Sequence, residues 1–214
     1  MDFYTFLDKL KFELQHPLPG EDAQLLMAPS IRRKMSTYKF DELNPKISAV
    51  LALVYPNANL EPTMVLTLRQ SYPGVHSGQI SFAGGKKDDD DVSLKHTALR
   101  EAREEIGIPE EEIQVLAELS NLYIPPSNFL VYPFLAYTDH TPSFITDETE
   151  VASIIEFNPL QLINEEIKDK MIIEKHPSGN HVTAPYYQIH EHKVWGATAI
   201  ILSEIEAIIK KFNS

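Results

Sequence analysis

Acidic and basic side chains are concentrated in one short segment, residues 100–108, which reads Arg-Glu-Ala-Arg-Glu-Glu-Ile-Gly-Ile. On a helix, at about 100° per residue, Glu101, Glu104 and Glu105 share one edge of the surface. Glu101 and Glu105 are four residues apart, and two carboxylates at this spacing repel each other unless a cation lies between them. Mg²⁺ or Mn²⁺ takes carboxylate oxygens, water and substrate phosphates as ligands. The spacing therefore favours a divalent-metal site.

A second interpretation of this segment needs no metal. Arg100 and Glu104 are also four residues apart and can pair, and alternating Arg and Glu residues are typical of a solvated helix face. For the isolated segment, this structural interpretation is the more common one. The surrounding chain has to decide between the two.

Residues 92–106 are predicted to form the helix that carries these groups. Its apolar positions recur every four residues: Leu94, Ala98, Ala102 and Ile106. Asp91 or Ser93 can cap the first turn, and Gly107 is suited to end the last one. The three carboxylates then border the face of the helix that packs against the rest of the protein.

Apolar runs on both sides of this helix predict a sheet. The expected strands are residues 47–55, 64–68, 113–122, 129–137 and 150–157, with a hairpin of 186–189 and 193–195. Helices are expected over residues 2–14 and 196–212, and the glycine-rich residues 69–91 are expected to form a loop. This order predicts an α/β protein of the α+β type, with a mixed sheet covered by helices. No sharp boundary divides residues 1–214, so a single domain is expected.

Composition narrows the function. The chain of 214 residues has a net charge of −12 and no cysteine, which disfavours nucleic-acid binding and excludes thiolate chemistry. The longest apolar run, residues 47–55, is too short to span a membrane, so a soluble, cytoplasmic protein with a small-molecule partner is expected. A homodimer is expected only because dimers are the commonest assembly.

Residues 85–108 resemble the Nudix box, G-x5-E-x7-R-E-U-x-E-E-x-G-U, in which U is apolar. The matching positions are Gly85, Arg100, Glu101, Glu104, Glu105, Gly107 and Ile108. Asp91 stands where the box has Glu, and eight residues separate it from Arg100 instead of seven. This resemblance favours the metal-site interpretation over the solvated helix.

The preceding segment resembles the signature L-L-T-x-R-[SA]-x3-R-x3-G-x3-F-P-G-G of the coenzyme A pyrophosphatase branch of Nudix hydrolases. Residues 66–69 and 76–85 carry the likeness, and the spacing from Arg69 through Gly78 to Phe82 fits. Three positions depart from the signature: Gln70, Gly74 and Ala83. Gly74 replaces an Arg that could meet a phosphate, a charge that residues 86–87 or 32–34 could supply instead.

The resemblance implies a Nudix-like mixed sheet sandwiched between helices, with residues 1–45 as an N-terminal helical extension. It implies metal-dependent hydrolysis of the diphosphate bond of coenzyme A or an acyl-CoA to 4′-phosphopantetheine and adenosine 3′,5′-bisphosphate. A first alternative is a Nudix pyrophosphatase for ADP-ribose, a dinucleotide or another nucleoside diphosphate derivative. A second is a catalytically silent ligand-binding module on the same fold.

The same resemblance assigns roles to individual residues. The metal ligands, for Mg²⁺ or Mn²⁺, are Glu101, Glu105 and the carbonyl of Gly84. The catalytic residues are Glu104 and Arg100, which braces it, together with a general base that is either a glutamate of the box or one from a later loop. Outside the box the candidate base is Glu150, with Glu148 as second choice. The residues expected near substrate are Arg69, His76, Gly78, Phe82 and Lys86.

Overall fold

The computed structural model describes residues 1–32, 34–71, 78–173 and 182–213. His76 and Gly74, both singled out in the sequence, lie outside the described residues. The helices are α1 (Phe3–Glu13), α2 (Gly20–Gln24), α3 (Phe40–Leu43), α4 (Leu94–Ile106) and α5 (Gly196–Lys210), together with short 3₁₀ turns. No helix in the described part of the chain is long and apolar enough to cross a membrane.

Two sheets hold the described strands together. The larger contains β1 (Lys46–Pro56), β2 (Pro62–Arg69), β3 (Ile80–Ser81), β4 (Ala83–Lys86), β5 (Gln114–Glu118), β6 (Leu122–Ile124), β7 (Phe129–Tyr137) and β8 (Val151–Phe157). The smaller consists of β9 (Lys168–Ile173), β10 (Val182–Ile189) and β11 (His192–Trp195). The larger sheet is mixed, because β1 and β7 are parallel whereas β1 pairs antiparallel with both β2 and β4.

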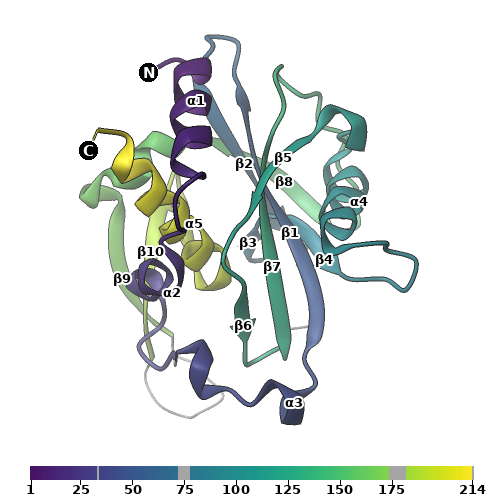
Figure 1. Cartoon of the computed structure of the whole chain (residues 1–214), viewed down its shortest axis with the longest axis vertical. Coiled ribbons are helices and arrows are strands. Elements are labelled where there is room, and N and C mark those ends of the chain that lie inside the picture. Colours follow the sequence, from purple (N-terminus) through teal and green to yellow (C-terminus); the bar gives the residue numbers. More distant parts are fainter. Residues whose placement is uncertain (33, 72–77, 174–181, 214) are drawn as a thin grey trace.

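Strand β1 is buried on both faces and separates two hydrophobic clusters. Ala49, Leu51 and Leu53 face the cluster that contains α4, while Ala52 and Val54 face the cluster that contains α1 and α5. Figure 1 shows the resulting layers, with α4 on one side of the sheet and α1 and α5 on the other. Alternate residues of one strand thus anchor both layers, as expected for a central strand.

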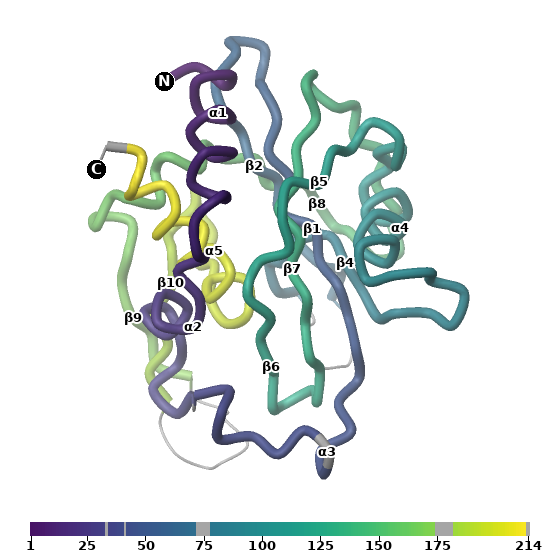
Figure 2. The backbone as a smooth tube through the Cα atoms, viewed as in Figure 1, coloured from purple at the N-terminus to yellow at the C-terminus, as the bar shows by residue number. Residues whose placement is uncertain are grey.

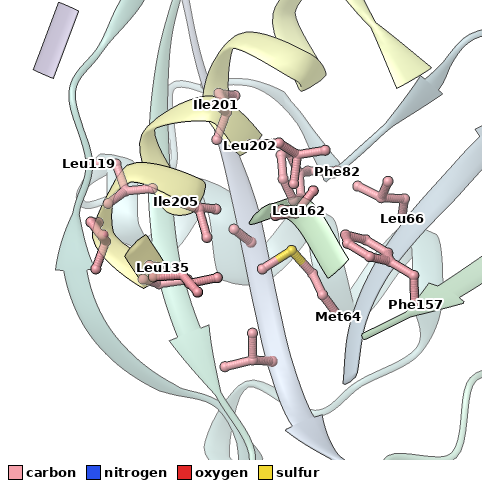
Figure 3. Packing of buried hydrophobic residues seen from close by; sticks show 14 of the residues in the cluster. Met64, Leu66, Phe82, Leu119, Leu135, Phe157, Leu162, Ile201, Leu202 and Ile205 are labelled. Atoms are coloured by element: carbon pink, nitrogen blue, oxygen red, sulfur yellow. The ribbon is translucent and has the colours of Figure 1, made fainter. Parts of the chain in front are cut away.

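The second cluster is the larger one, and it joins the two ends of the chain. In Figure 2, α1 and α5 run side by side. The rings of Phe6 and Phe212 meet edge to face, with centroids 5.5 Å apart. Figure 3 shows α5 packed through Ile201, Leu202 and Ile205 onto the apolar face of the sheet. This packing makes the sheet a rigid support for the residues on its opposite face.

The mixed sheet between helices confirms the predicted fold class, and most predicted elements are present. The expected strand 113–122 is interrupted and becomes β5 and β6. The expected loop 69–91 is wrong in part, because it contains β3 and β4. Three residues of β4, two of them glycines, pair with Ala49, Val50 and Leu51 of β1. The backbone hydrogen bonds to β1 thus outweigh the weak strand propensity of glycine.

The predicted end of the central helix at Ile106 is confirmed, whereas the helix begins at Leu94, two residues later than predicted, and Ser93 is the cap of the two candidates. The Ser93 hydroxyl accepts a hydrogen bond from the backbone N–H of His96 at 3.1 Å, which is an N-cap. Gly107 ends α4 with φ of +74°, a left-handed conformation that glycine adopts without a Cβ penalty. A Cβ at that position would lie 2.6 Å from the carbonyl oxygen of Ile145, so the site also requires a missing side chain.

Candidate active site

Helix α4 lies against strand β4, and two glycines allow the close approach. The Gly84 N–H donates to Glu105 Oε2 at 3.1 Å. A Cβ on Gly85 would lie 2.4 Å from Glu101 Oε1, and one on Gly84 would lie 2.4 Å from the Ala49 carbonyl oxygen. The glycine pair therefore lets the two carboxylates of α4 contact the backbone of the sheet.

Glu105 is the most buried of these acids. Its side chain is 3% exposed, and its Oε1 lies 3.2 Å from Arg69 Nη1 at the end of β2. Burial raises the pKa of Glu105 to about 7, while Arg69 and the Gly84 N–H act in the opposite direction. An additional cation nearby would therefore stabilise the charged form of this buried carboxyl.

The loop before β8 lies next to the same carboxylate. The Asp147 N–H donates to the Glu105 carbonyl oxygen at 3.1 Å, and Arg69 Nη2 lies 3.6 Å from Glu150 Oε2. Gln70 holds this loop twice, because its side-chain amide donates to the Glu148 carbonyl at 2.9 Å and its backbone N–H to the Glu150 carbonyl at 2.8 Å. The Glu150 side chain stays half exposed, beside the buried Glu105.

A second arginine, Arg100, is held by Asp91. The Arg100 Nε and Nη2 atoms each lie 3.0 Å from an oxygen of Asp91, which also accepts hydrogen bonds from Thr97 Oγ1 and the Asp88 N–H, both at 2.9 Å. Asp91 is 5% exposed, and its bond to Arg100 holds the pKa of the carboxyl well below its usual range. This carboxylate stays ionised and fixes the guanidinium.

The free end of the Arg100 fork reaches the other two acids of α4. Its Nη1 lies 3.0 Å from Glu101 Oε1 and 2.9 Å from Glu104 Oε2. Burial raises the pKa of Glu101, and Arg100 opposes that rise. Glu104 is half exposed and also lies 3.5 Å from Arg103 Nη2. Arg100 therefore braces Glu104, as the sequence predicted, and restrains Glu101 as well.

The residues of this site fit a divalent cation by their chemistry. Glu101, Glu105 and Glu150 offer hard oxygen donors, and the charges of Glu101 and Glu150 each raise the pKa of Glu105. A cation shared among them would relieve that repulsion. Among the residues that the structure describes, no group of three or more Asp, Glu, His or Cys side chains is already gathered as a metal cluster. Arginine side chains contact several of these oxygens instead.

The other predicted site residues are placed as follows. Gly78 has φ of +64° and follows the part of the chain that is not described. Phe82 is 2% exposed and belongs to the main hydrophobic cluster, so its ring packs the core and offers no surface to a substrate in this structure. Lys86 is exposed, and its carbonyl accepts a hydrogen bond from Arg100 Nη2 at 3.2 Å.

Sequence reasoning missed the work of two residues. The sequence offers Asp91 as a possible helix cap and as the residue in the place of the box glutamate, whereas in the structure it anchors Arg100. Gln70 departs from the signature, and nothing in the sequence indicates the hydrogen bond that its side chain donates to the Glu148 carbonyl. The Gln70 contact joins segments that only the fold brings together.

Comparison with known proteins identifies the family. The NUDIX domain matches residues 45–175, which is more than half of the chain and includes α4, β4 and the Glu150 loop. The chain belongs to the Nudix family. As a Nudix protein it is a pyrophosphohydrolase that acts on nucleoside diphosphate derivatives, and Nudix enzymes generally use divalent metal ions.

Two curated relatives agree with this assignment, and one solved structure has the same fold. The uncharacterized Nudix hydrolase NudL of Photorhabdus laumondii is 32% identical over 145 residues, covering 68% of this chain and 76% of that protein. NudL of Yersinia pestis (strain Pestoides F) is 30% identical over 169 residues, covering 79% and 82%. A MutT/nudix family protein from Enterococcus faecalis has the same fold, with a TM-score of 0.53 at 17% identity, covering 95% of this Nudix chain and 74% of that one.

Proposed function

We propose that this Nudix enzyme hydrolyses the diphosphate bond of coenzyme A or an acyl-CoA, releasing 4′-phosphopantetheine and adenosine 3′,5′-bisphosphate. The observation that carries the proposal is the contact between Arg69 and Glu105 at 3.2 Å. Arg69 belongs to the segment that resembles the coenzyme A branch, and Glu105 belongs to the Nudix box. Their contact supports a role for the branch segment in the site where the diphosphate is cut.

The proposed site binds Mg²⁺ or Mn²⁺ through Glu101, Glu105 and the Gly84 carbonyl. When bound, the ion lowers the pKa of a coordinated water and neutralises charge on the phosphoryl oxygens. Glu104 orients water near this centre, and Arg100, fixed by Asp91, keeps its carboxylate in place.

Glu150 is the proposed general base. Its carboxylate is 52% exposed and lies on the loop tied to the Glu105 backbone, so water reaches it while the fold keeps it beside the metal ligands. Glu150 takes the proton of the attacking water as the water oxygen bonds to one phosphorus of the diphosphate. The bond from that phosphorus to the bridging oxygen breaks, and the leaving phosphate keeps the bridging oxygen and the electron pair. Residues 1–214 act as one domain in this proposal, with residues 1–45 as an extension.

The substrate is tested by incubating the protein with coenzyme A, acetyl-CoA, ADP-ribose, a dinucleotide and a nucleoside triphosphate, with Mg²⁺ or with EDTA. Mass spectrometry should detect phosphopantetheine and adenosine bisphosphate only with the metal. Cleavage of ADP-ribose or the dinucleotide instead would retain the Nudix reaction and overturn the substrate. Absence of any metal-dependent cleavage would favour a binding module.

Glu105→Gln tests the site itself. The amide keeps the size of the side chain but offers the cation no charged oxygen, so Mg²⁺-dependent turnover should be abolished. Circular dichroism should remain unchanged. The matched control is Glu111→Gln, an exposed acid of the turn after α4 with an unchanged rate. Near-normal turnover in Glu105→Gln would contradict the metal assignment.

A further inference from the structure

The two arginines that contact the proposed metal ligands are held in different ways. The Nε and Nη2 atoms of Arg100 donate to Asp91, at 3.0 Å each, and Nη2 also donates to the Lys86 carbonyl. Arg69 instead directs Nη1 at Glu105 and Nη2 at Glu150, at 3.2 Å and 3.6 Å. One guanidinium is neutralised by an acid outside the proposed metal-ligand set, and the other lies between a proposed ligand and the proposed base.

The charge of Arg69 compensates the burial of the Glu105 carboxylate. That side chain is 3% exposed, and a buried carboxylate is costly unless a cation or hydrogen-bond donors compensate it. Glu101 and Glu150 add like charge nearby, which increases the cost. The Arg69 side chain is 22% exposed, so solvent and ligands reach it from one side.

A divalent cation at Glu105 would compensate the same buried carboxylate with two positive charges. The oxygen that contacts Arg69 is one of only two on the Glu105 carboxyl, and the other accepts the Gly84 N–H. Each carboxylate oxygen has two lone pairs, so an ion on Glu105 could share Oε1 with the guanidinium, but the two cations would then lie close together and repel each other.

We propose that Arg69 is the internal counter-ion of Glu105 and Glu150, and that it competes with the divalent cation for these carboxylates. The inference rests on the proposed function, because it takes Glu105 as a metal ligand. A guanidinium that merely shaped Glu105 for the metal would act with the opposite sign.

The test is calorimetric titration of the protein with Mg²⁺, without substrate, at pH 8.5. At this pH few protons compete with the metal for carboxylate oxygens. Arg69→Ala and Arg69→Gln should each bind Mg²⁺ about tenfold more tightly than the wild type, or more, the equivalent of one charge-assisted hydrogen bond. Arg69→Gln keeps a neutral donor, so it carries the test if the alanine variant does not fold.

Arg103→Ala is the matched control. It removes an equal charge from α4, where Arg103 is half exposed and contacts Glu104 and Glu110 instead of Glu105. Its affinity should change by less than about threefold, because exposed charges are screened. A similar gain in Arg103→Ala and Arg69→Gln would overturn the proposal, since it would then reflect net charge alone.

Thermal unfolding gives a second readout that does not need activity. Mg²⁺ should raise the melting temperature of Arg69→Gln more than that of the wild type, because tighter binding to the folded state adds stability by mass action. Unchanged or weaker Mg²⁺ binding in both Arg69 variants, with normal binding in the wild type, overturns this inference and leaves the proposed function intact. Failure of all proteins to bind Mg²⁺ overturns both.

Discussion

Replacing Asp91 with alanine should destabilise the protein and release Arg100 from its fixed position. Asp91 is 5% exposed and accepts two bonds from Arg100, one from Thr97 and one from the Asp88 N–H. Alanine leaves all these donors without the carboxylate. Arg100 contacts Glu101 and Glu104 with its remaining nitrogen, so a displaced guanidinium would no longer hold these carboxylates in place. Turnover should therefore fall along with stability.

The size of the effect follows from these contacts. Removing one partner of a buried ion pair costs about 3–5 kcal/mol. The Arg100 side chain is 14% exposed and keeps its contacts with Glu101 and Glu104, which places the expected loss near the lower end, at about 3 kcal/mol. For a chain of this size, each kcal/mol lowers the melting temperature by roughly 2–4 °C, so a decrease of about 6–12 °C is expected.

Urea unfolding of four proteins measures the ion pair directly: the wild type, Asp91→Ala, Arg100→Ala and the double variant. The coupling energy between the two changes should be about 2 kcal/mol, because the second substitution removes a partner that is already lost. Asp90→Ala is the control, since this neighbouring aspartate is exposed, and its stability should stay within about 0.5 kcal/mol of the wild type. Independent effects of Asp91→Ala and Arg100→Ala would refute the anchor.

Asp91→Glu sharpens the same prediction. It restores the residue type of the Nudix box, yet this chain has one residue more between that position and Arg100. An added methylene in a buried, fully bonded position costs about 1–3 kcal/mol. Asp91→Glu should therefore be less stable than the wild type, and a gain in stability would show that the inserted residue does not compensate for the shorter side chain.

Two further predictions concern the glycine pair and the pH dependence. Gly84→Ala should fail to fold or lose several kcal/mol of stability, because its Cβ would lie 2.4 Å from the Ala49 backbone carbonyl oxygen. Gly85→Ala should fold and lose activity, because its Cβ meets the movable carboxylate of Glu101. Circular dichroism and turnover distinguish the two outcomes. The raised pKa of Glu105, about 7 against 4.5, means that the metal-free folded protein holds a proton that the unfolded chain releases. The stability that Glu105 contributes is therefore present below pH 4.5 and is lost, by about 3 kcal/mol, as the pH rises through 7. Urea unfolding at pH 5 and pH 8 should show this loss in the wild type and not in Glu105→Gln.

The sequence by itself determined the features that depend on neighbours along the chain. The period of Leu94, Ala98 and Ala102 set the helix and its buried face, and Ser93 and Gly107 set its ends. The arc of acids on α4 follows from helix geometry alone. Local steric and hydrogen-bonding preferences are sufficient for these features, so one sequence was enough to predict them.

The tertiary structure decided which distant groups meet. Arg69 reaches Glu105 across 36 positions of the chain, and Gln70 reaches Glu148 across 78. Strand β4 forms because β1 presents a free ladder to residues with little strand propensity of their own, and Phe82, which the resemblance had placed near substrate, packs in the core. Such contacts depend on the spatial order of strands, and no local pattern encodes that order, because many strand orders satisfy the same alternation of apolar and polar residues.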